Sequence, residues 1–415
     1  MREMKDSGIE WIGEIPKGWE LRRAKTLFTQ RNSKGNGIEV LLSPTQKYGV
    51  VPQSQLEGVV QVKEDTDLQM FKTVHKGDFV ISLRSFQGGF EYSLYEGVCS
   101  PAYQVFYPTS PICDTYYRYL FKSQSFISKM NNLTVGIREG KNIQYVDFAN
   151  SQIPVPPLAE QERIAAFLDA ECAEIDAVLE KTRASIEEYK KLKQAVITQA
   201  VTKGIRGDRP MKNSGSVWFE EIPCNWVMKR IKYLFHIKKD IAGKEGYTVL
   251  SITQRGIQPK DLSKNEGQIA ANYSQYQLLA PGDFAMNHMD LLTGWVDISK
   301  YSGVTSPDYR VFVLDDAEKN DSSYYLYLMQ MCYFNRIFYG LGQGVSGMGR
   351  WRLQADKFLN FPVVVPPVDE QKEIVSYLNE KCKQLDTLIR NKQQYIIEIE
   401  NYKKSLIYEY VTGKK

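Results

Sequence analysis

The sequence predicts an α+β chain in which two mostly-β domains are joined by two long helices that form an antiparallel coiled coil. Three observations support this prediction. The chain repeats itself after about half of its 415 residues, each half opens with short β-type runs broken by Gly and Pro, and each half closes with a long heptad pattern. Such an internal repeat predicts a pseudo-two-fold molecule.

The repeat begins with a matched opening block. SGIEWIGEIPKGWELRRAKTLF, residues 7–28, aligns without a gap with SGSVWFEEIPCNWVMKRIKYLF, residues 214–235, and 11 of the 22 positions are identical. Three further pairs follow in the same order: LLSPTQKYGVVP with VLSITQRGIQP, KGDFVISLRSFQGGF with PGDFAMNHMDLLTGW, and GVCSPAYQVF with GVTSPDYRVF. We expect one domain at 1–155 and a second domain at 206–365.

Each domain also contains one helix-like stretch, at 114–130 and at 322–338. Aromatic residues align between the two stretches, as in Tyr116 with Tyr324. Their apolar spacing predicts that these aromatics are core residues.

The two long helices are expected at 156–205 and 366–415. Residues 158–202 contain no Gly or Pro, and seam residues recur at alternating spacings of four and three in both segments, 210 residues apart. This narrow stripe is typical of a coiled coil. The apolar residues expected to pair the helices are Leu168, Ile175, Leu179, Ile186, Leu378, Leu385, Ile389 and Ile396. Polar residues occupy the same two seam places in each helix and would set the register, namely Thr182 and Lys193, and Lys392 and Lys403.

The direction of pairing follows from the reach of the linker. A helix of about 45 residues is ~67 Å long, whereas the roughly nine residues after Gly204 reach only about 30 Å. A parallel pair would require the chain to return along the whole helix. The sequence therefore predicts an antiparallel pair, with one globular domain at each end.

Composition excludes several classes of protein. No run of about 18 apolar residues and no signal-peptide core is present, so we expect a cytoplasmic protein without a membrane-spanning segment. The six cysteines form no CxxC pair and the three histidines are far apart in sequence, so neither a metal site nor a disulfide framework is expected. The net charge of +4 permits a polyanionic partner without demanding one.

Two similar domains in inverted orientation suit duplex DNA, where inverted half-sites recur about one helical turn apart. Residues 1–155 carry 18 Lys and Arg against 16 Asp and Glu, and residues 206–365 carry 19 against 16, whereas residues 156–205 carry 7 against 9. The positive excess lies in the globular domains. A structural scaffold that joins two protein partners without touching DNA is the alternative interpretation.

No catalytic signature is recognisable. GIREGKN at 136–142 has its glycines too close for a phosphate loop, and Asn142 replaces the Ser or Thr that would bind magnesium. No HExxH, GxSxG or paired-carboxylate cluster is present. We expect no catalytic residue, although a stand-alone methyltransferase with unrecognised motifs is a rival interpretation.

The doubled motifs resemble the specificity subunit of a type I restriction-modification enzyme. The resemblance rests on the WIGEIPKGW opening, the GDF and SP-x-Y-x-VF blocks, and above all IPVPPLAEQERIAAFLDAECAEID before a long helix, all in duplicate. It covers essentially the whole chain. The Pro-Pro-x-x-Glu-Gln helix start at Pro156 and again at Pro366 is its most specific part.

The resemblance implies a non-catalytic subunit with two target recognition domains, each reading one half of an asymmetric bipartite site in double-stranded DNA. The long helices would act as a spacer and as the docking surface for two methyltransferase subunits, which restriction and translocase subunits can join. S-adenosylmethionine, ATP and Mg²⁺ would be bound by those partners, and this chain would hold no cofactor.

Comparison of the two halves sorts the candidate DNA-binding residues. Lys47 and Arg255 lie in a block that the halves share, which favours contact with phosphate, because phosphate contacts position a protein without reading sequence. Where the halves differ after Gly-Asp-Phe, base reading is predicted, since Arg suits guanine and Asn or Gln suits adenine. These residues are Arg84, Ser85 and Gln87 in the first half and Asn287, His288 and Asp290 in the second. Glycine-flanked segments add Arg138, Lys141, Arg350 and Arg352 as further candidates for phosphate.

Overall fold

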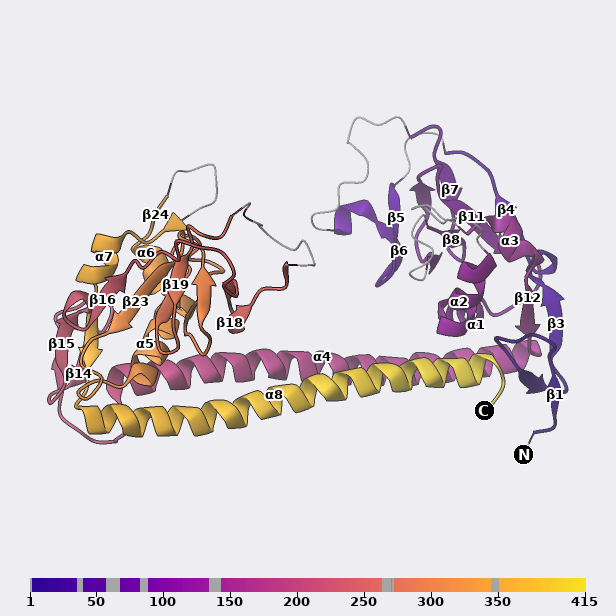
Figure 1. Ribbon diagram of the computed structural model, residues 1–415. Coiled ribbons are helices and arrows are strands. Elements are labelled where there is room, and N and C mark those ends of the chain that lie inside the picture. Colours follow the sequence, from indigo (N-terminus) through magenta and orange to yellow (C-terminus); the bar gives the residue numbers. More distant parts are fainter. Residues whose placement is uncertain are drawn as a thin grey trace. The chain divides into compact units, whose positions relative to one another are not determined.

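The computed structural model describes residues 2–35, 40–56, 68–82, 89–133, 143–262, 270, 272–344 and 351–415. The chain forms two compact units, Met1–Arg183 with Gln394–Lys415, and Ala184–Gln393. Each unit therefore contains one globular domain, part of helix α4 (Leu158–Lys203) and part of helix α8 (Val368–Val411) (Figure 1). We refer to them as unit 1 and unit 2.

The globular domain of unit 1 is built around a four-stranded antiparallel sheet in the order β4-β11-β8-β9. The strands of this sheet are β4 (Phe28–Arg31), β11 (Gln104–Pro108), β8 (Phe79–Ile81) and β9 (Phe90–Tyr92). Two-stranded ladders surround it: β1 (Met4–Asp6) with β2 (Glu14–Pro16), β3 (Glu20–Arg23) with β12 (Gln152–Val155), β5 (Leu42–Thr45) with β6 (Gly49–Pro52), and β7 (Lys72–Val74) with β10 (Gly97–Cys99). The helices are α1 (Asp114–Lys122), α2 (Gln124–Leu133) and α3 (Tyr145–Asn150).

Buried aromatic rings join the sheet of unit 1 to its helices. Phe28 packs edge-on against Phe79, and Phe106 lies 4.6 Å from Phe148 between ring centroids. Phe121 of α1 contacts rings from both sides of this cluster. The aligned aromatics of the sequence therefore form the core, as their spacing predicts.

The globular domain of unit 2 repeats this architecture in the same chain order. Its central sheet has the order β16-β23-β20-β21, with strands β16 (Phe235–Lys238), β23 (Arg310–Leu314), β20 (Phe284–Met286) and β21 (Val296–Ile298). The ladders are β13 (Met211–Asn213) with β14 (Glu221–Pro223), β15 (Val227–Arg230) with β26 (Pro362–Val365), β17 (Leu250–Thr253) with β18 (Gly256–Pro259), β19 (Gln277–Leu279) with β22 (Gly303–Thr305), and β24 (Gln343–Gly344) with β25 (Trp351–Arg352). The helices are α5 (Ser322–Phe334), α6 (Ile337–Gly340) and α7 (Ala355–Asn360). This confirms the predicted repeat of two mostly-β domains.

The two predicted helix-like stretches are interrupted. The first divides into α1 and α2 at Ser123, whose backbone is extended with ψ of 139° and whose hydroxyl donates to the Leu120 carbonyl. The second ends at Phe334, and Arg336, with φ of +56°, begins the short helix α6. Apolar spacing continues across both breaks, so the sequence pattern does not reveal them.

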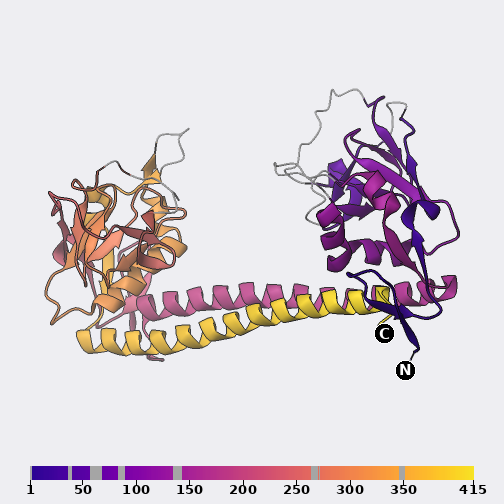
Figure 2. The same ribbon diagram turned by 45° about the vertical axis from the view of Figure 1, so that its right-hand side comes forward.

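Helices α4 and α8 lie side by side in Figures 1 and 2 and run antiparallel. In unit 1 the Phe167 ring stacks on Tyr410 at 4.4 Å, and Asp176, farther along α4, pairs with the earlier Lys403 of α8 at 2.6 Å. In unit 2 Lys193 pairs with Asp386 at 2.7 Å. Residues later in α4 thus contact residues earlier in α8, which confirms the predicted antiparallel coiled coil.

The polar seam lysines occupy equivalent places in the two units. Lys193 and Lys403 are 210 residues apart, as are their partners Asp176 and Asp386. An ion pair of this partly exposed kind contributes only about 0.2–1 kcal/mol, so its main effect is to favour one register. All eight apolar seam residues named above are buried or half-buried.

Candidate DNA-binding surfaces

The Pro-Pro-x-x-Glu-Gln motif fastens each long helix to its globular domain. In unit 1 the Gln161 amide donates to the Pro156 carbonyl at 2.8 Å and accepts from the Cys113 backbone N–H at 2.9 Å. In unit 2 Gln371 donates to Pro366 at 2.9 Å and accepts from Asp321 N–H at 2.8 Å. The glutamines are 2% and 0% exposed, so this motif is a structural junction.

The glutamate of the motif binds a buried tryptophan from the opening block. Trp19 Nε1 donates to Glu160 at 3.1 Å, and Trp226 Nε1 donates to Glu370 at 2.9 Å. Burial raises the pKa of the Glu370 carboxyl, but hydrogen bonds from Trp226 and Arg209 outweigh burial and keep the pKa below its ordinary value. The charged carboxylate therefore holds the opening block on the helix start.

A buried tyrosine in each domain holds the end of the other long helix. Tyr116 donates its hydroxyl proton to the Val411 carbonyl of α8 at 2.8 Å, and Tyr324 donates to the Val201 carbonyl of α4 at 2.9 Å. These hydrogen bonds satisfy carbonyls that the helix itself leaves unpaired. Each domain thus binds the start of one long helix and the end of the other.

Lys47 and Arg255 lie at equivalent hairpin turns. Lys47 is exposed in the β5–β6 turn, with its ammonium 4.8 Å from the centre of the Tyr48 ring. Arg255 is exposed in the β17–β18 turn, where its backbone N–H donates to Thr253 Oγ1 at 3.1 Å. Neither side chain forms an ion pair among the described residues, so both cations face solvent.

Asn287 and Asp290 shape their own loop after β20. The Asn287 side-chain oxygen accepts from the Met289 and Asp290 backbone N–H groups at 3.2 and 3.3 Å. Asp290 accepts from the backbone N–H groups of Leu292 and Thr293 at 3.0 Å. These side chains therefore have a local structural role.

His288 and Arg352 lie close together although 64 residues separate them. The Leu353 N–H donates to the His288 carbonyl at 2.9 Å, which ties the strand β25 segment to the loop after β20. Burial, together with the positive charges of Arg310 and Arg352, lowers the pKa of His288 to about 4. The imidazole is therefore neutral at pH 7.

The remaining six candidates fall outside the described residues. They are Arg84, Ser85, Gln87, Arg138, Lys141 and Arg350. The residues that flank two of these segments are hydrogen-bonded to each other. The Ser82 N–H donates to the Gly89 carbonyl at 2.8 Å, and β24 pairs with β25 on either side of residues 345–350.

Sequence reasoning missed Arg310, which lies 6% exposed at the start of β23. Its Nη2 donates to the Leu353 carbonyl at 2.8 Å, and burial lowers its pKa to about 10. The signal was present in the sequence, because Gln104 stands at the aligned place in GVCSPAYQVF. In this otherwise matched block the first half has a neutral residue where the second half has a charged one.

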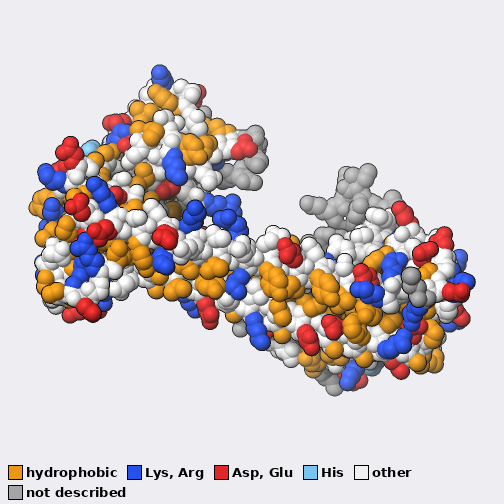
Figure 3. Space-filling view, turned by 90° about the horizontal axis from the view of Figure 1, so that it is seen from below, with side chains coloured by type: hydrophobic (Ala, Val, Ile, Leu, Met, Phe, Trp, Pro, Cys, Tyr) orange, Lys and Arg blue, Asp and Glu red, His pale blue; other side chains and the backbone are white. Residues whose placement is uncertain are grey.

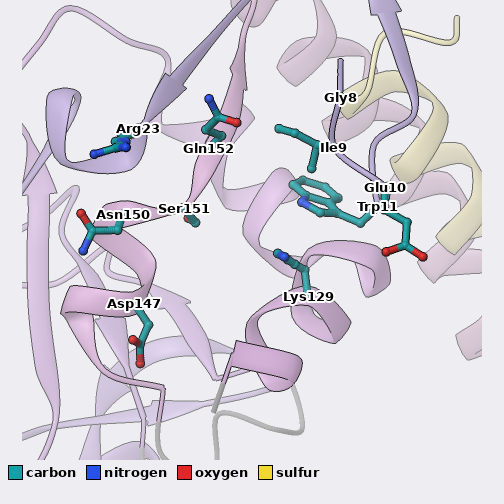
Figure 4. Close-up of a pocket in the computed structure, with 10 residues that line it drawn as sticks. All are labelled: Gly8, Ile9, Glu10, Trp11, Arg23, Lys129, Asp147, Asn150, Ser151 and Gln152. Atoms are coloured by element: carbon teal, nitrogen blue, oxygen red, sulfur yellow. The ribbon is translucent and has the colours of Figure 1, made fainter. Parts of the chain in front are cut away.

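Two grooves lie in unit 1. Figure 4 shows the first, about 590 Å³, with Trp11 and Lys129 on one side and Asp147 and Asn150 on the other. None of the candidate DNA-binding residues lines it. The second, about 470 Å³, lies between the β5–β6 hairpin, α1 and the two long helices, and Lys47 is among its lining residues.

The described part of the chain has neither a cluster of metal-ligating side chains nor a membrane-spanning helix. Within those ranges no three His, Cys, Asp or Glu side chains are grouped closely enough to bind a metal ion. No described helix has the length and apolar character required to span a membrane.

Comparison with known proteins agrees with the fold. The family model of the type I restriction modification DNA specificity domain matches residues 12–188 and again 223–401. The MjaVIII specificity subunit of Methanocaldococcus jannaschii is 24% identical over 66% of this chain and 65% of its own length. The putative MjaX specificity subunit of the same organism is 23% identical over 97% of this chain and 95% of its own length.

Solved structures show the same fold across the whole chain. A chain from a study of complex assembly and conformational transition of the type I R-M system has a TM-score of 0.70 at 15% identity and covers 96% of this chain and 98% of its own. The HsdS subunit of Thermoanaerobacter tengcongensis has a TM-score of 0.52 at 16% identity, covering 97% and 98%. With two matched domains that together span most of its length, this chain belongs to the family of type I restriction-modification specificity subunits, which are non-catalytic DNA-recognition subunits.

Proposed function

We propose that the chain recognises an asymmetric bipartite site in duplex DNA, with one globular domain on each half-site, and positions methyltransferase and motor-nuclease subunits on it. The observation that carries this proposal is the contrast between the two domains. Their junctions with the long helices make the same hydrogen bonds, whereas the sequence after the shared Gly-Asp-Phe block differs between the halves. A framework built twice with unlike residues after this block suits two unlike half-sites.

The proposed target recognition domains are residues 1–155 and 206–365, and the spacer helices are residues 156–205 and 366–415. Lys47 and Arg255 are well placed for phosphate, because both are exposed cations at equivalent turns. Arg138, Lys141, Arg350 and Arg352 would add phosphate contacts. Arg84, Ser85, Gln87, Asn287, His288 and Asp290 would face base edges.

An apolar stripe on the long helices supports the docking of partner subunits. Five exposed apolar residues each directly precede a seam residue and so share one heptad position. They are Val178, Tyr395 and Tyr402 in unit 1, and Leu192 and Leu388 in unit 2, with 40–55% of their surface exposed. Figure 3, which looks at the helices from below, shows hydrophobic side chains among charged ones on this side.

The other flank of the helix pair is already occupied. In unit 1, Asp169 of α4 accepts from the Tyr119 hydroxyl of the globular domain at 2.7 Å. In unit 2, Asn379 of α8 accepts from Tyr327 at 2.8 Å. Because this flank binds the globular domains, the exposed apolar stripe on the opposite flank is the surface available to partner helices, which would bury it.

The experiment that tests the proposal is modification-sensitive long-read sequencing of genomic DNA from cells with and without this gene. The expected result is that methyladenine disappears at one split motif made of two short, unlike half-sites. If co-expression with the neighbouring methyltransferase and nuclease genes also produces no split motif, the chain does not direct methylation, and the scaffold interpretation replaces this proposal.

A further inference from the structure

Arg310 carries a buried positive charge without a carboxylate partner. No ion pair among the described residues includes it, and its guanidinium lies 4.9 Å from the centre of the Phe358 ring. Burial of an unpaired charge destabilises a fold, and a pKa of about 10 leaves the side chain charged at pH 7. The charge therefore requires an explanation beyond stability.

The first domain performs the same structural task with a neutral residue. Gln104 donates its amide to the Gln144 side chain at 2.9 Å and accepts from the Tyr145 N–H at 2.6 Å. These contacts hold residues 144–145, which correspond to residues 354–355 of the second domain, directly after the Leu353 carbonyl that Arg310 binds. The framework thus does not need a cation at this place, and the charge of Arg310 serves something particular to the second domain.

The backbone of Leu353 connects Arg310 to His288. Arg310 donates to the Leu353 carbonyl at 2.8 Å, and the Leu353 N–H donates to the His288 carbonyl at 2.9 Å. On the other side of the loop, Tyr333 donates its hydroxyl proton to the Asn287 carbonyl at 2.8 Å. The backbone that carries the His288 ring is therefore fixed from two directions.

The His288 ring is half-buried in the loop after β20. Its Nδ1 is buried and makes no side-chain hydrogen bond of good geometry among the described residues, and a contact with the Met286 backbone partly opposes the lowering of the ring's pKa. Arg310 and Arg352 disfavour a positive charge on the ring, and Tyr333 and Asp290 are the other titratable groups close by. The ring is therefore neutral at pH 7.

We propose that Arg310 is a positioning residue that, through Leu353, holds the His288 imidazole where it contacts a base edge of the second half-site. A neutral imidazole has one N–H donor and one acceptor nitrogen, and the major groove offers acceptors at purine N7, guanine O6 and thymine O4 and donors at adenine N6 and cytosine N4. This inference rests on the proposed DNA-binding function. It assigns Gln104 and Arg310 unlike roles, although they occupy equivalent places.

The first test requires no DNA. The chain has three histidines, so ¹⁵N-histidine labelling of the full-length protein gives three ring signals for two-bond NMR correlation spectra. We expect the His288 ring to be neutral from pH 8 to pH 5. In Arg310→Gln the titration of His288 should move towards 6.5, whereas in Arg310→Lys it should remain low. An ordinary titration of His288 in the unaltered protein, or a titration that Arg310→Gln leaves unchanged, would overturn the proposal.

The second test uses the complex with the methyltransferase subunit and a DNA library in which each half-site is randomised in turn. We expect His288→Ala to lose roughly 10-fold or more of the discrimination at one base pair of the second half-site, and His288→Gln, which keeps a hydrogen-bond donor and acceptor, to retain part of it. First-half preferences should be unchanged in both variants. Unchanged second-half preferences in His288→Ala would overturn the inference alone, whereas a complex that methylates no split motif would overturn the proposed function.

Discussion

The two globular domains are most alike where they meet the long helices and less alike at the β5–β6 and β17–β18 turns and around Gln104 and Arg310. Gln161 and Gln371 make the same pair of hydrogen bonds to within 0.1 Å. By contrast, Gln104 and Arg310 anchor equivalent segments with different charge, and Tyr48 has no counterpart beside Arg255. The comparison teaches that the same junction is built in both domains, while residues at equivalent places elsewhere differ in charge and contacts.

Substitution of the junction glutamines should lower the stability of each unit more than any other change proposed for these domains. In Gln371→Leu, the Pro366 carbonyl and the Asp321 N–H lose their partner in a site that is fully buried. We expect the free energy of unfolding of unit 2 to fall by about 1–3 kcal/mol, with an equal loss in unit 1 for Gln161→Leu. Differential scanning calorimetry would measure both.

The neighbouring exposed residues provide matched controls for these variants. Glu162→Gln and Lys372→Gln lie next to the glutamines but are exposed, so each should change stability by less than about 0.5 kcal/mol. Equal losses for the buried and the exposed substitutions would show that the glutamines do not hold the helices.

The two units should respond to pH in opposite directions. Burial raises the pKa of Glu91 in unit 1 from 4.5 to about 7, with Lys122 opposing the shift. The folded chain binds this proton more tightly, so the stabilisation is present below pH 4.5 and is lost as the pH rises through 7. His288 in unit 2 has its pKa lowered from 6.5 to about 4, so its stabilisation is present above pH 6.5 and is lost as the pH falls towards 4.

Calorimetry at pH 7 and pH 5 would test this opposition. On going from pH 7 to pH 5 we expect unit 1 to become more stable by on the order of 1–2 kcal/mol and unit 2 to become less stable. Glu91→Gln should abolish the first change and His288→Gln the second. A common shift of both units that neither substitution alters would contradict the assignment.

The interhelix ion pairs should produce the smallest effect. Lys193→Met and Lys403→Met each replace a partly exposed seam lysine and leave Asp386 or Asp176 unpaired near solvent. We expect changes in the free energy of unfolding below about 1 kcal/mol, equal in the two units. We also expect the helix register to slip in the doubly substituted chain, because these lysines favour one register. Disulfide trapping of the register would measure the slip, and an undisturbed register would contradict this expectation.

Much of the fold could be predicted from the sequence because repeats and heptads are local patterns. The antiparallel pairing follows from the length of the linker, and the cores follow from aligned aromatics such as Tyr116 and Tyr324. The hydrogen bonds of Gln161 and Gln371 could not be predicted, because Cys113 and Asp321 lie about 50 residues away. Helix-dipole reasoning gave these glutamines an adequate but less specific explanation.

The candidate site was harder to predict because its geometry depends on long-range contacts. The sequence singled out His288 and Arg352, but only the structure brings them together through Leu353 and shows Arg310 beneath them. It also shows that Asn287 and Asp290 hydrogen-bond within their own loop. Polar loop residues stabilise turns as readily as they contact ligands, and sequence alone does not separate these roles.

The most direct test of the central claim is to replace residues 206–365 with a second copy of residues 1–155 and to sequence the methylated DNA produced with the partner methyltransferase. The account predicts that the first half-site is retained, that the second disappears, and that the motif becomes an inverted repeat of the first half-site. A motif that still contains two unlike half-sites would contradict the claim that each domain reads its own half.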